Sequence, residues 1–275
     1  IFGYGIIPAM GIKGIAVSTI TSQALGTFYI IYKVYKTEFK EYLYLQCFKP
    51  KLKILLDLVS QGIPAALGMM MISVGVFIIL FFISQYGDLA LAGYGTAIRY
   101  EQIFLLPVLG LNTAVLSMVG QNFGAKNIER VEEIYNKALY FGCTFMFVCG
   151  FVIYFTASTA VGLFTDDPEV IKYGTMYLQI TALMEPIYPI FFISNALIQG
   201  IKKANVVMML TFGRMVFMPA IVLTYLIFYL ESSFAFVFWG LLIINWIFGI
   251  FVLMLTKRLI SVSYTHLTLP TNREV

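Results

Sequence analysis

Long uncharged runs of apolar residues alternate along this chain with short polar segments. Because the hydrocarbon core of a bilayer is about 30 Å thick, a helix of roughly 20 apolar residues can cross it. Uncharged runs cover residues 14–32, 58–87, 102–125, 138–165 and 232–256, and two further spans, around 173–201 and 204–230, are each interrupted by one charge, Glu185 and Arg214. The pattern predicts an all-α polytopic membrane protein with six full-length spans and a first span that is nearly long enough.

Composition excludes a water-soluble domain. Hydrophobic residues make up 60% of the chain and charged residues 12%, whereas about a quarter of a typical soluble domain is charged. No segment combines dense Lys and Arg with a polar, aromatic-bearing surface, so no nucleic-acid partner is expected. The surroundings that fit this composition are membrane lipids.

Basic residues gather in every second loop. Beyond the first span, only Lys172 falls on one side, while thirteen basic residues fall on the other. By the positive-inside rule the Lys/Arg-rich loops are cytoplasmic, which predicts a multi-pass protein of the plasma (inner) membrane. The thirteen are Lys33, Lys36, Lys40, Lys49, Lys51, Lys53, Lys126, Arg130, Lys137, Lys202, Lys203, Lys257 and Arg258.

The same pattern divides the chain into segments. Residues 34–56 are basic and aromatic, and we interpret them as a cytoplasmic amphipathic linker. Residues 57–258 form a six-helix transmembrane bundle. The chain opens without an initiator Met, and its last residues, 259–275, include a polar stretch unlike the preceding sequence. We expect a truncated reading frame with a non-native tail.

Motifs for enzymatic chemistry are missing from the sequence. Cys47, Cys143 and Cys149 have no zinc-site spacing, and the single histidine, His266, lies in the tail. There is no Walker A, HExxH or GxSxG motif. We therefore expect no catalytic residue, no metal and no cofactor, and a proton or sodium ion as the energy source instead of ATP.

Glu185 is the strongest candidate for function. It lies near the middle of its expected span, and Pro186 and Pro189 follow it, so the helix should be kinked or unwound there. Charges inside membranes are costly and often functional. A carboxyl in a low-dielectric site favours its protonated form, so it can bind a proton and release it when hydrated, or attract a cation. The alternatives are a structural partner for Arg214 or Arg99, and a tolerated residue at the edge of a pore.

Two further charges lie close together in the third span. Arg99 and Glu101 are two residues apart and point to different faces of a helix, so each needs a partner on another helix. Glu101 is a candidate second coupling carboxylate. Arg99 and Arg214 are expected to be structural charges.

Several uncharged side chains are candidates for lining a cavity. Aromatic faces beside a carboxylate suit an organic cation, and embedded amides can line a pathway, although many, such as Asn245, only hold helices together. The cavity-lining candidates are Asn112, Gln179, Tyr188, Phe191 and Asn195.

An ordered set of motifs resembles the multidrug and toxic compound extrusion (MATE) family. Within the family, these motifs resemble the DinF-like branch more than the NorM-like branch. Residues 8–19 fit the pattern P-x-x-G-x-x-G-x-A-x-x-T at the entry to the family's sixth helix. The other matching segments are Gly62-Ile63-Pro64, residues 97–99 and 106–111, the exit loop 119–127, and the loop 163–171.

This resemblance implies the second half of a twelve-helix transporter. Residues 1–33 would be the end of the first-half bundle, and the missing N-terminal half would be a partner of this segment. Family members exchange protons or sodium for cationic, amphipathic compounds by alternating access. Two departures matter: the acidic residue of the first helix is absent with the first bundle, and residues 69–73 lack the seventh-helix glutamate of the NorM-like branch.

Three functions follow as hypotheses. The first is an ion-coupled antiporter that exports cationic drugs and xenobiotics. The second is a flippase for lipid-linked oligosaccharides, which predicts a cationic cavity. The third is a structural or receptor-like membrane protein, which predicts that all buried charges are paired. We expect the 275-residue chain not to transport by itself.

Overall fold

A computed structural model describes residues 10–38 and 51–268, and within these ranges all regular structure is helical. The chain divides into two compact units, Ile1–Asp57 and Leu58–Val275. The expected linker lies largely outside the described residues, as do the last residues of the expected tail, 269–275.

The first unit contains α1 (Gly11–Tyr35), a 25-residue helix that is long and apolar enough to cross a membrane. Near its end, the Lys33 and Lys36 ammonium groups lie 5.5 Å and 4.6 Å from the ring centroids of Tyr29 and Tyr32. Long basic side chains that fold back over aromatic rings are common where a helix leaves the apolar core of a bilayer.

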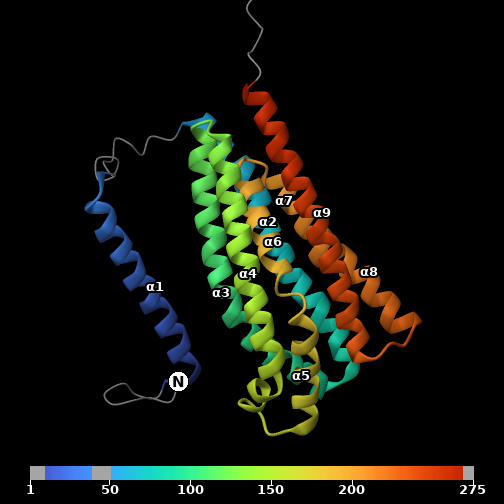
Figure 1. Cartoon of the computed structure of the whole chain (residues 1–275). Coiled ribbons are helices and arrows are strands. Elements are labelled where there is room, and N and C mark those ends of the chain that lie inside the picture. Colours follow the sequence, from blue (N-terminus) through green and yellow to red (C-terminus); the bar gives the residue numbers. More distant parts are fainter. Residues whose placement is uncertain (1–9, 39–50, 269–275) are drawn as a thin grey trace, which may run out of the picture. The chain divides into compact units, whose positions relative to one another are not determined.

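The second unit is a bundle of long helices (Figure 1). Helix α3 packs against α4, α5 and α6, and α9 packs against α5 and α6. Six described helices, α1 among them, meet the length and hydropathy required of a membrane span, which confirms the all-α polytopic fold. The elements are α2 (Leu52–Ile83), η3 (Ser84–Tyr86), α3 (Asp88–Gly124), α4 (Ile128–Gly162), α5 (Pro168–Thr181), α6 (Ile187–Gly200), α7 (Ala204–Phe212), η4 (Gly213–Phe217), α8 (Met218–Thr224), η5 (Tyr225–Tyr229) and α9 (Phe234–Thr268).

Short turns with strong capping signals join these helices. The Asp167 carboxylate accepts hydrogen bonds from the backbone N–H groups of Glu169 (2.9 Å) and Val170 (3.3 Å), and Pro168 occupies the first turn of α5. Asp as an N-cap followed by Pro is a typical helix start. Because these turns are tight, the membrane spans that they join run antiparallel.

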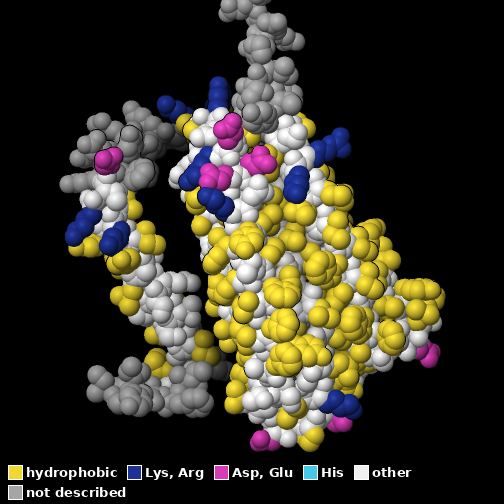
Figure 2. Space-filling model, in the orientation of Figure 1, with side chains coloured by type: hydrophobic (Ala, Val, Ile, Leu, Met, Phe, Trp, Pro, Cys, Tyr) yellow, Lys and Arg dark blue, Asp and Glu magenta, His cyan; other side chains and the backbone are white. Residues whose placement is uncertain are grey.

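The apolar interior of the bundle consists of two main clusters. One contains Tyr94, Ile153, Tyr177 and Phe238, and the other contains Val119, Tyr135, Leu197 and Val252. In Figure 2 hydrophobic side chains cover the middle of the second unit, and charged side chains gather at its two ends. Along α3, Glu101 falls between the residues of the first cluster and those of the second. A buried polar layer therefore lies between two apolar cores.

Candidate functional site

The expected span 173–201 is broken in its middle. Residues 182–186 form a turn that separates α5 from α6, which confirms the break predicted from Pro186 and Pro189. Pro186 has no N–H to donate, so the helical hydrogen-bond ladder cannot continue through it. Inside the turn, the Ile187 N–H donates to the Met184 carbonyl (2.9 Å) and the Tyr188 N–H donates to the Glu185 carbonyl (3.3 Å).

Glu185 lies in this turn and is fully buried, with 0% of its surface exposed. Neither carboxyl oxygen has a hydrogen-bond partner among the described residues. The alternative of a structural pair with Arg214 or Arg99 gains no support, because no ion pair joins either arginine to Glu185 in the described part of the chain. A buried carboxyl without a partner is costly in its charged form.

Gly150 of α4 lets the turn lie close to the neighbouring helix. A Cβ atom at this position would stand 2.6 Å from the Ala182 carbonyl oxygen and 3.4 Å from the Glu185 Cβ. Small residues allow such backbone contact between membrane helices. The position of Glu185 thus depends on a glycine in α4.

We expect Gly150→Ala to destabilise the protein by about 1–3 kcal/mol, because the added methyl overpacks against backbone that cannot move aside easily. Gly95→Ala in α3 is the matched control. A Cβ atom at Gly95 would meet nothing within 4 Å, so this change should stabilise its helix by about 0.5–1 kcal/mol. Thermal unfolding in detergent compares the two, and equal effects would contradict the close-contact argument.

Glu101 of α3 has a different environment from Glu185. It is 2% exposed, and its carboxylate accepts hydrogen bonds from two phenol groups. The Tyr188 hydroxyl donates to Oε1 at 3.1 Å, and the Tyr177 hydroxyl donates to Oε2. Tyr177 belongs to α5 and Tyr188 to α6, so one carboxylate is held by both helices that flank the broken turn.

Arg214 lies near the same region, on the side opposite Glu101. It lies in the π-helical segment η4, a geometry that is often found at functional positions. Its Nε–H donates to Asn245 Oδ1 at 2.7 Å, and its guanidinium carbon lies 4.1 Å from the ring centroid of Phe191 and 5.7 Å from that of Tyr188. Among the described residues it forms no ion pair, so its positive charge is held by an amide and aromatic faces.

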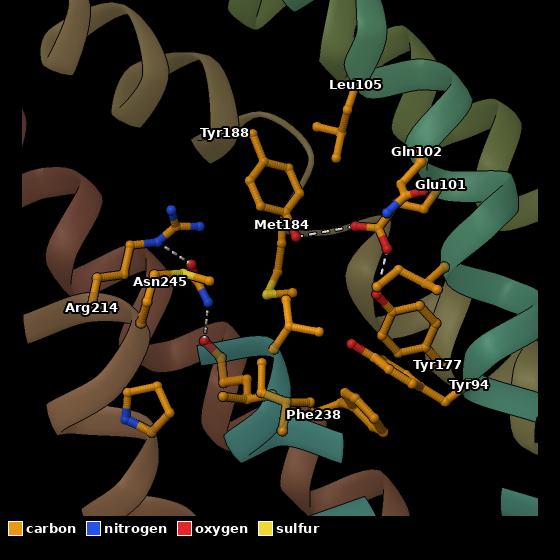
Figure 3. Close-up of a pocket in the computed structure, with 16 residues that line it drawn as sticks. Tyr94, Glu101, Gln102, Leu105, Tyr177, Met184, Tyr188, Arg214, Phe238 and Asn245 are labelled. Atoms are coloured by element: carbon orange, nitrogen blue, oxygen red, sulfur yellow. Dashed lines mark hydrogen bonds between the residues drawn. The ribbon is translucent and has the colours of Figure 1, made fainter. Parts of the chain in front are cut away.

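Glu101 and Arg214, but not Glu185, line a cavity of about 160 Å³ between α3, α5, α6, η4 and α9 (Figure 3). Figure 3 shows Glu101 and Gln102 on one wall and Arg214 on the other, with Tyr188 between them. The cavity is smaller than the roughly 300–1,000 Å³ of typical drug sites. Its polar lining residues are Tyr94, Glu101, Gln102, Tyr177, Tyr188, Arg214 and Asn245.

A membrane helix that is broken near the bilayer midplane is a feature of transporters, whose ion and substrate sites lie at such breaks. The MatE family model matches residues 64–226, more than half of the chain. The chain belongs to the MATE family. Its membership makes this a multi-pass membrane protein of a transporter family.

Curated relatives support this membership of the MATE family. The probable multidrug resistance protein YpnP of Bacillus subtilis is 31% identical over 191 residues, covering 70% of this chain and 42% of that protein. The probable multidrug resistance protein NorM of Thermotoga maritima is 26% identical over 212 residues, covering 77% of this chain and 46% of that protein. The chain thus spans less than half the length of these relatives.

Solved structures show the same MATE fold. One is a multidrug resistance MATE family transporter in an outward-facing conformation, with a TM-score of 0.85 at 22% identity, covering 93% of this chain and 57% of that one. Another is a MOP superfamily transporter from Pyrococcus furiosus, described as having a binding pocket of reverse polarity, with a TM-score of 0.85 at 22% identity, covering 93% of this chain and 58% of that one.

Some of the residues that the sequence suggests for lining a cavity lie at the 160 Å³ cavity, and others do not. Tyr188 lines it, and Phe191 is buried beneath the Arg214 guanidinium. Asn112, Gln179 and Asn195 are partly buried but do not line this cavity, although the Asn195 Oδ1 is buried without a hydrogen-bond partner among the described residues.

Arg99 and Glu101 point to different faces of α3, as expected, since Arg99 is exposed and Glu101 is buried. The partner expected for Arg99 on another helix is not present within the described ranges, where Arg99 has no hydrogen bond or ion pair. The partners of Glu101 are Tyr177 and Tyr188.

The sequence interpretation missed Tyr177 and the role of Asn245. Tyr177 lies eleven residues before Tyr188, and the break between them could have suggested that both phenols face one site. Asn245 is expected from the sequence only to hold helices together, and no sequence signal joins it to Arg214, which is 31 residues away.

Proposed function

We propose that this chain is the second half of a proton-coupled antiporter that exports organic cations, with Glu101 and Glu185 as the coupling carboxylates. The missing N-terminal half completes the transporter, which lies in the plasma membrane with its Lys/Arg-rich loops in the cytoplasm. The curated relatives named as multidrug resistance proteins support the substrate class.

The observation that carries this proposal is the buried Glu101 carboxylate with its two tyrosine donors. An ionised carboxylate only accepts hydrogen bonds, whereas a protonated carboxyl must also donate one. Protonation of Glu101 therefore places a hydrogen on one of the two oxygens that Tyr177 and Tyr188 contact, so the phenol at that oxygen must accept instead of donate, and both hydrogen bonds lose the strength that a charged acceptor gives them. Since these tyrosines lie on either side of the broken turn, proton binding weakens the tether between α5 and α6 and so changes the preferred geometry of the break.

A proton fits this site better than sodium does. The Arg214 charge lines the same cavity without an anionic partner in the described part of the chain, and it opposes entry of a second cation. The tyrosine hydroxyls already occupy both Glu101 oxygens as donors. A proton needs only one carboxyl oxygen, whereas a metal ion needs several ligands.

The substrate pathway follows an exposed polar face of α3. Its polar residues recur at spacings that fall on one side of a helix with 3.6 residues per turn. The Gln121 amide lies 3.5 Å from the Ser117 hydroxyl along this face. Lipid cannot satisfy such groups, so this face is expected to border a water-filled pathway or the missing half. The residues of this α3 polar face are Arg99, Gln102, Thr113, Ser117 and Gln121.

The test uses a full-length gene whose product carries this chain as its second half, expressed in efflux-deficient cells. We expect a proton gradient, and not a sodium gradient, to drive efflux of a fluorescent organic cation. Glu185→Gln should reduce proton-driven efflux roughly 5- to 150-fold, the factor that corresponds to typical coupling free energies of about 1–3 kcal/mol. Efflux driven by sodium alone would contradict proton coupling.

Arg99 favours a second candidate function. It is exposed on the α3 polar face without a partner among the described residues, and a cationic pathway suits a phosphate-bearing lipid such as a lipid-linked oligosaccharide. In the flippase, Arg99→Gln should abolish transbilayer movement of a fluorescent anionic lipid. In the exporter, the same change should preserve or increase cation efflux, because it removes a repulsive charge.

A further inference from the structure

A second concave site lies at the broken turn. It is on the side of the turn opposite Tyr177 and Tyr188, the two tyrosines that donate hydrogen bonds to Glu101. It is a groove of about 490 Å³ between α4, the turn 182–186 and α9, and no charged residue lines it. We call it the aromatic groove, and its main walls are Phe147, Phe151, Phe155, Leu183, Pro186 and Trp246.

The aromatic groove is open on a surface that faces the bilayer. Phe155 is 75% exposed, Leu183 48% and Trp246 36%. Large apolar side chains this exposed need an apolar neighbour, and both α4 and α9 qualify as membrane spans. The groove is thus continuous with the lipid-facing surface of the bundle.

The depth of the groove decides what can reach it. Gly150 lies twelve residues before the end of α4, and Trp246 lies twelve residues after the start of α9. At 1.5 Å rise per residue each is about 18 Å from the corresponding helix end, well inside a hydrocarbon core that is about 30 Å thick. At this depth the groove is surrounded by the acyl chains of the bilayer, away from headgroups and water. A hydrocarbon chain is therefore the expected occupant.

The groove also covers backbone that the broken helix leaves exposed. The Trp246 Nε1–H donates to the Leu183 carbonyl oxygen at 3.2 Å, so the indole satisfies one carbonyl of the turn from its lipid side. Non-helical backbone at membrane depth persists only where it is covered or satisfied. An apolar chain in the groove would keep water away from this hydrogen bond.

We propose that the aromatic groove binds one acyl chain of a membrane phospholipid, which covers the broken turn and keeps the Trp246–Leu183 hydrogen bond dry. The aromatic groove is separate from the cavity that Glu101 and Arg214 line, and its proposed occupant does not depend on the proposed transport function. Through the turn, its occupant contacts the segment that carries Glu185.

The test exploits the two tryptophans of the chain. Trp239→Phe leaves Trp246 as the single fluorophore, and Trp246→Phe leaves Trp239. Each protein is reconstituted in nanodiscs of phosphatidylcholine with increasing fractions of lipid brominated at one of several positions along its chains, because bromine quenches indole on contact and Trp239 lies seven residues nearer the start of α9 than Trp246. The strongest quenching found at any bromine position is compared between the two proteins. Trp239 is 43% exposed, against 36% for Trp246, so on this depth-matched scale random contact with surrounding lipid predicts at least as much quenching of Trp239.

We expect Trp246 to be quenched at least twofold more strongly than Trp239. Leu183→Phe, which fills the mouth of the groove, should bring Trp246 quenching down to the Trp239 level and shift its emission. Ile221→Phe is the matched control, since Ile221 is 51% exposed on α8 and does not line the groove. It should change nothing.

Three results would overturn the proposal. Trp246 quenching that does not exceed Trp239 quenching would mean ordinary surrounding lipid only. Trp246 quenching that Leu183→Phe leaves unchanged would place the bound chain outside the groove. Absence of Trp246 quenching in the full-length protein would assign the groove to another protein segment.

Discussion

Replacing Glu101 with glutamine is expected to abolish the response of efflux to a proton gradient. Glutamine has nearly the same shape and its carbonyl oxygen still accepts a hydrogen bond, so the change removes the titrating proton with little loss of packing. Gradient-driven accumulation should fall roughly 5- to 150-fold, the effect of losing about 1–3 kcal/mol of coupling free energy. The measurement is fluorescent-cation efflux at a series of imposed pH differences.

Glu169→Gln is the matched control for this change. Glu169 is an exposed carboxylate that pairs with Lys172 at 3.1 Å in the first turn of α5. Surface ion pairs contribute little, so its loss should leave efflux unchanged. Retention of the full pH response by Glu101→Gln, with normal amounts of folded protein, would show that Glu101 is only a structural acceptor for Tyr177 and Tyr188.

The fold was largely predictable from the sequence, because it depends on long-range composition and not on individual contacts. Uncharged runs of sufficient length allow only helices in a bilayer, and Pro186 after Glu185 indicated where one helix would break. In the span 204–230, Pro219 is a sequence signal for an interruption, and it stands in the first turn of α8, directly after the π-helical segment Gly213–Phe217. The second π-helical segment of this span, Tyr225–Tyr229, contains no proline or glycine and has no such signal.

The candidate site was predicted only in part. A charge in an apolar run is visible in a sequence, so Glu101, Glu185 and Arg214 were all identified. The partners of Glu101 and Arg214 are uncharged, and the sequence contains 18 tyrosines, so nothing distinguished Tyr177 from the rest. The alternative of an arginine partner for Glu185 rested on charge alone, whereas Arg214 is stabilised by an amide and by two aromatic rings.

Asn245→Leu is expected to be the most destabilising single change at the cavity. Arg214 is 8% exposed, and the Asn245 Oδ1 is the hydrogen-bond acceptor for its Nε–H. Leucine has no acceptor, so a buried cationic donor loses its partner at a cost of about 1–3 kcal/mol or more. Thermal unfolding in detergent should show this loss, and Thr224→Val is the control, because the Thr224 hydroxyl bonds only its own helix at the Ala220 carbonyl.

The double variant Arg214→Leu/Asn245→Leu separates the cost of the lone charge from the cost of lost packing. Removing a buried charge together with its partner is often neutral or stabilising, whereas removing one partner is strongly destabilising. The double variant should therefore unfold at a higher temperature than Asn245→Leu alone. Its cavity keeps Glu101 but loses the opposing cation, so sodium should now be able to support some efflux. Equal stability of the single and double variants would show that Asn245 acts through packing alone, and continued exclusion of sodium would show that Arg214 does not set the ion preference.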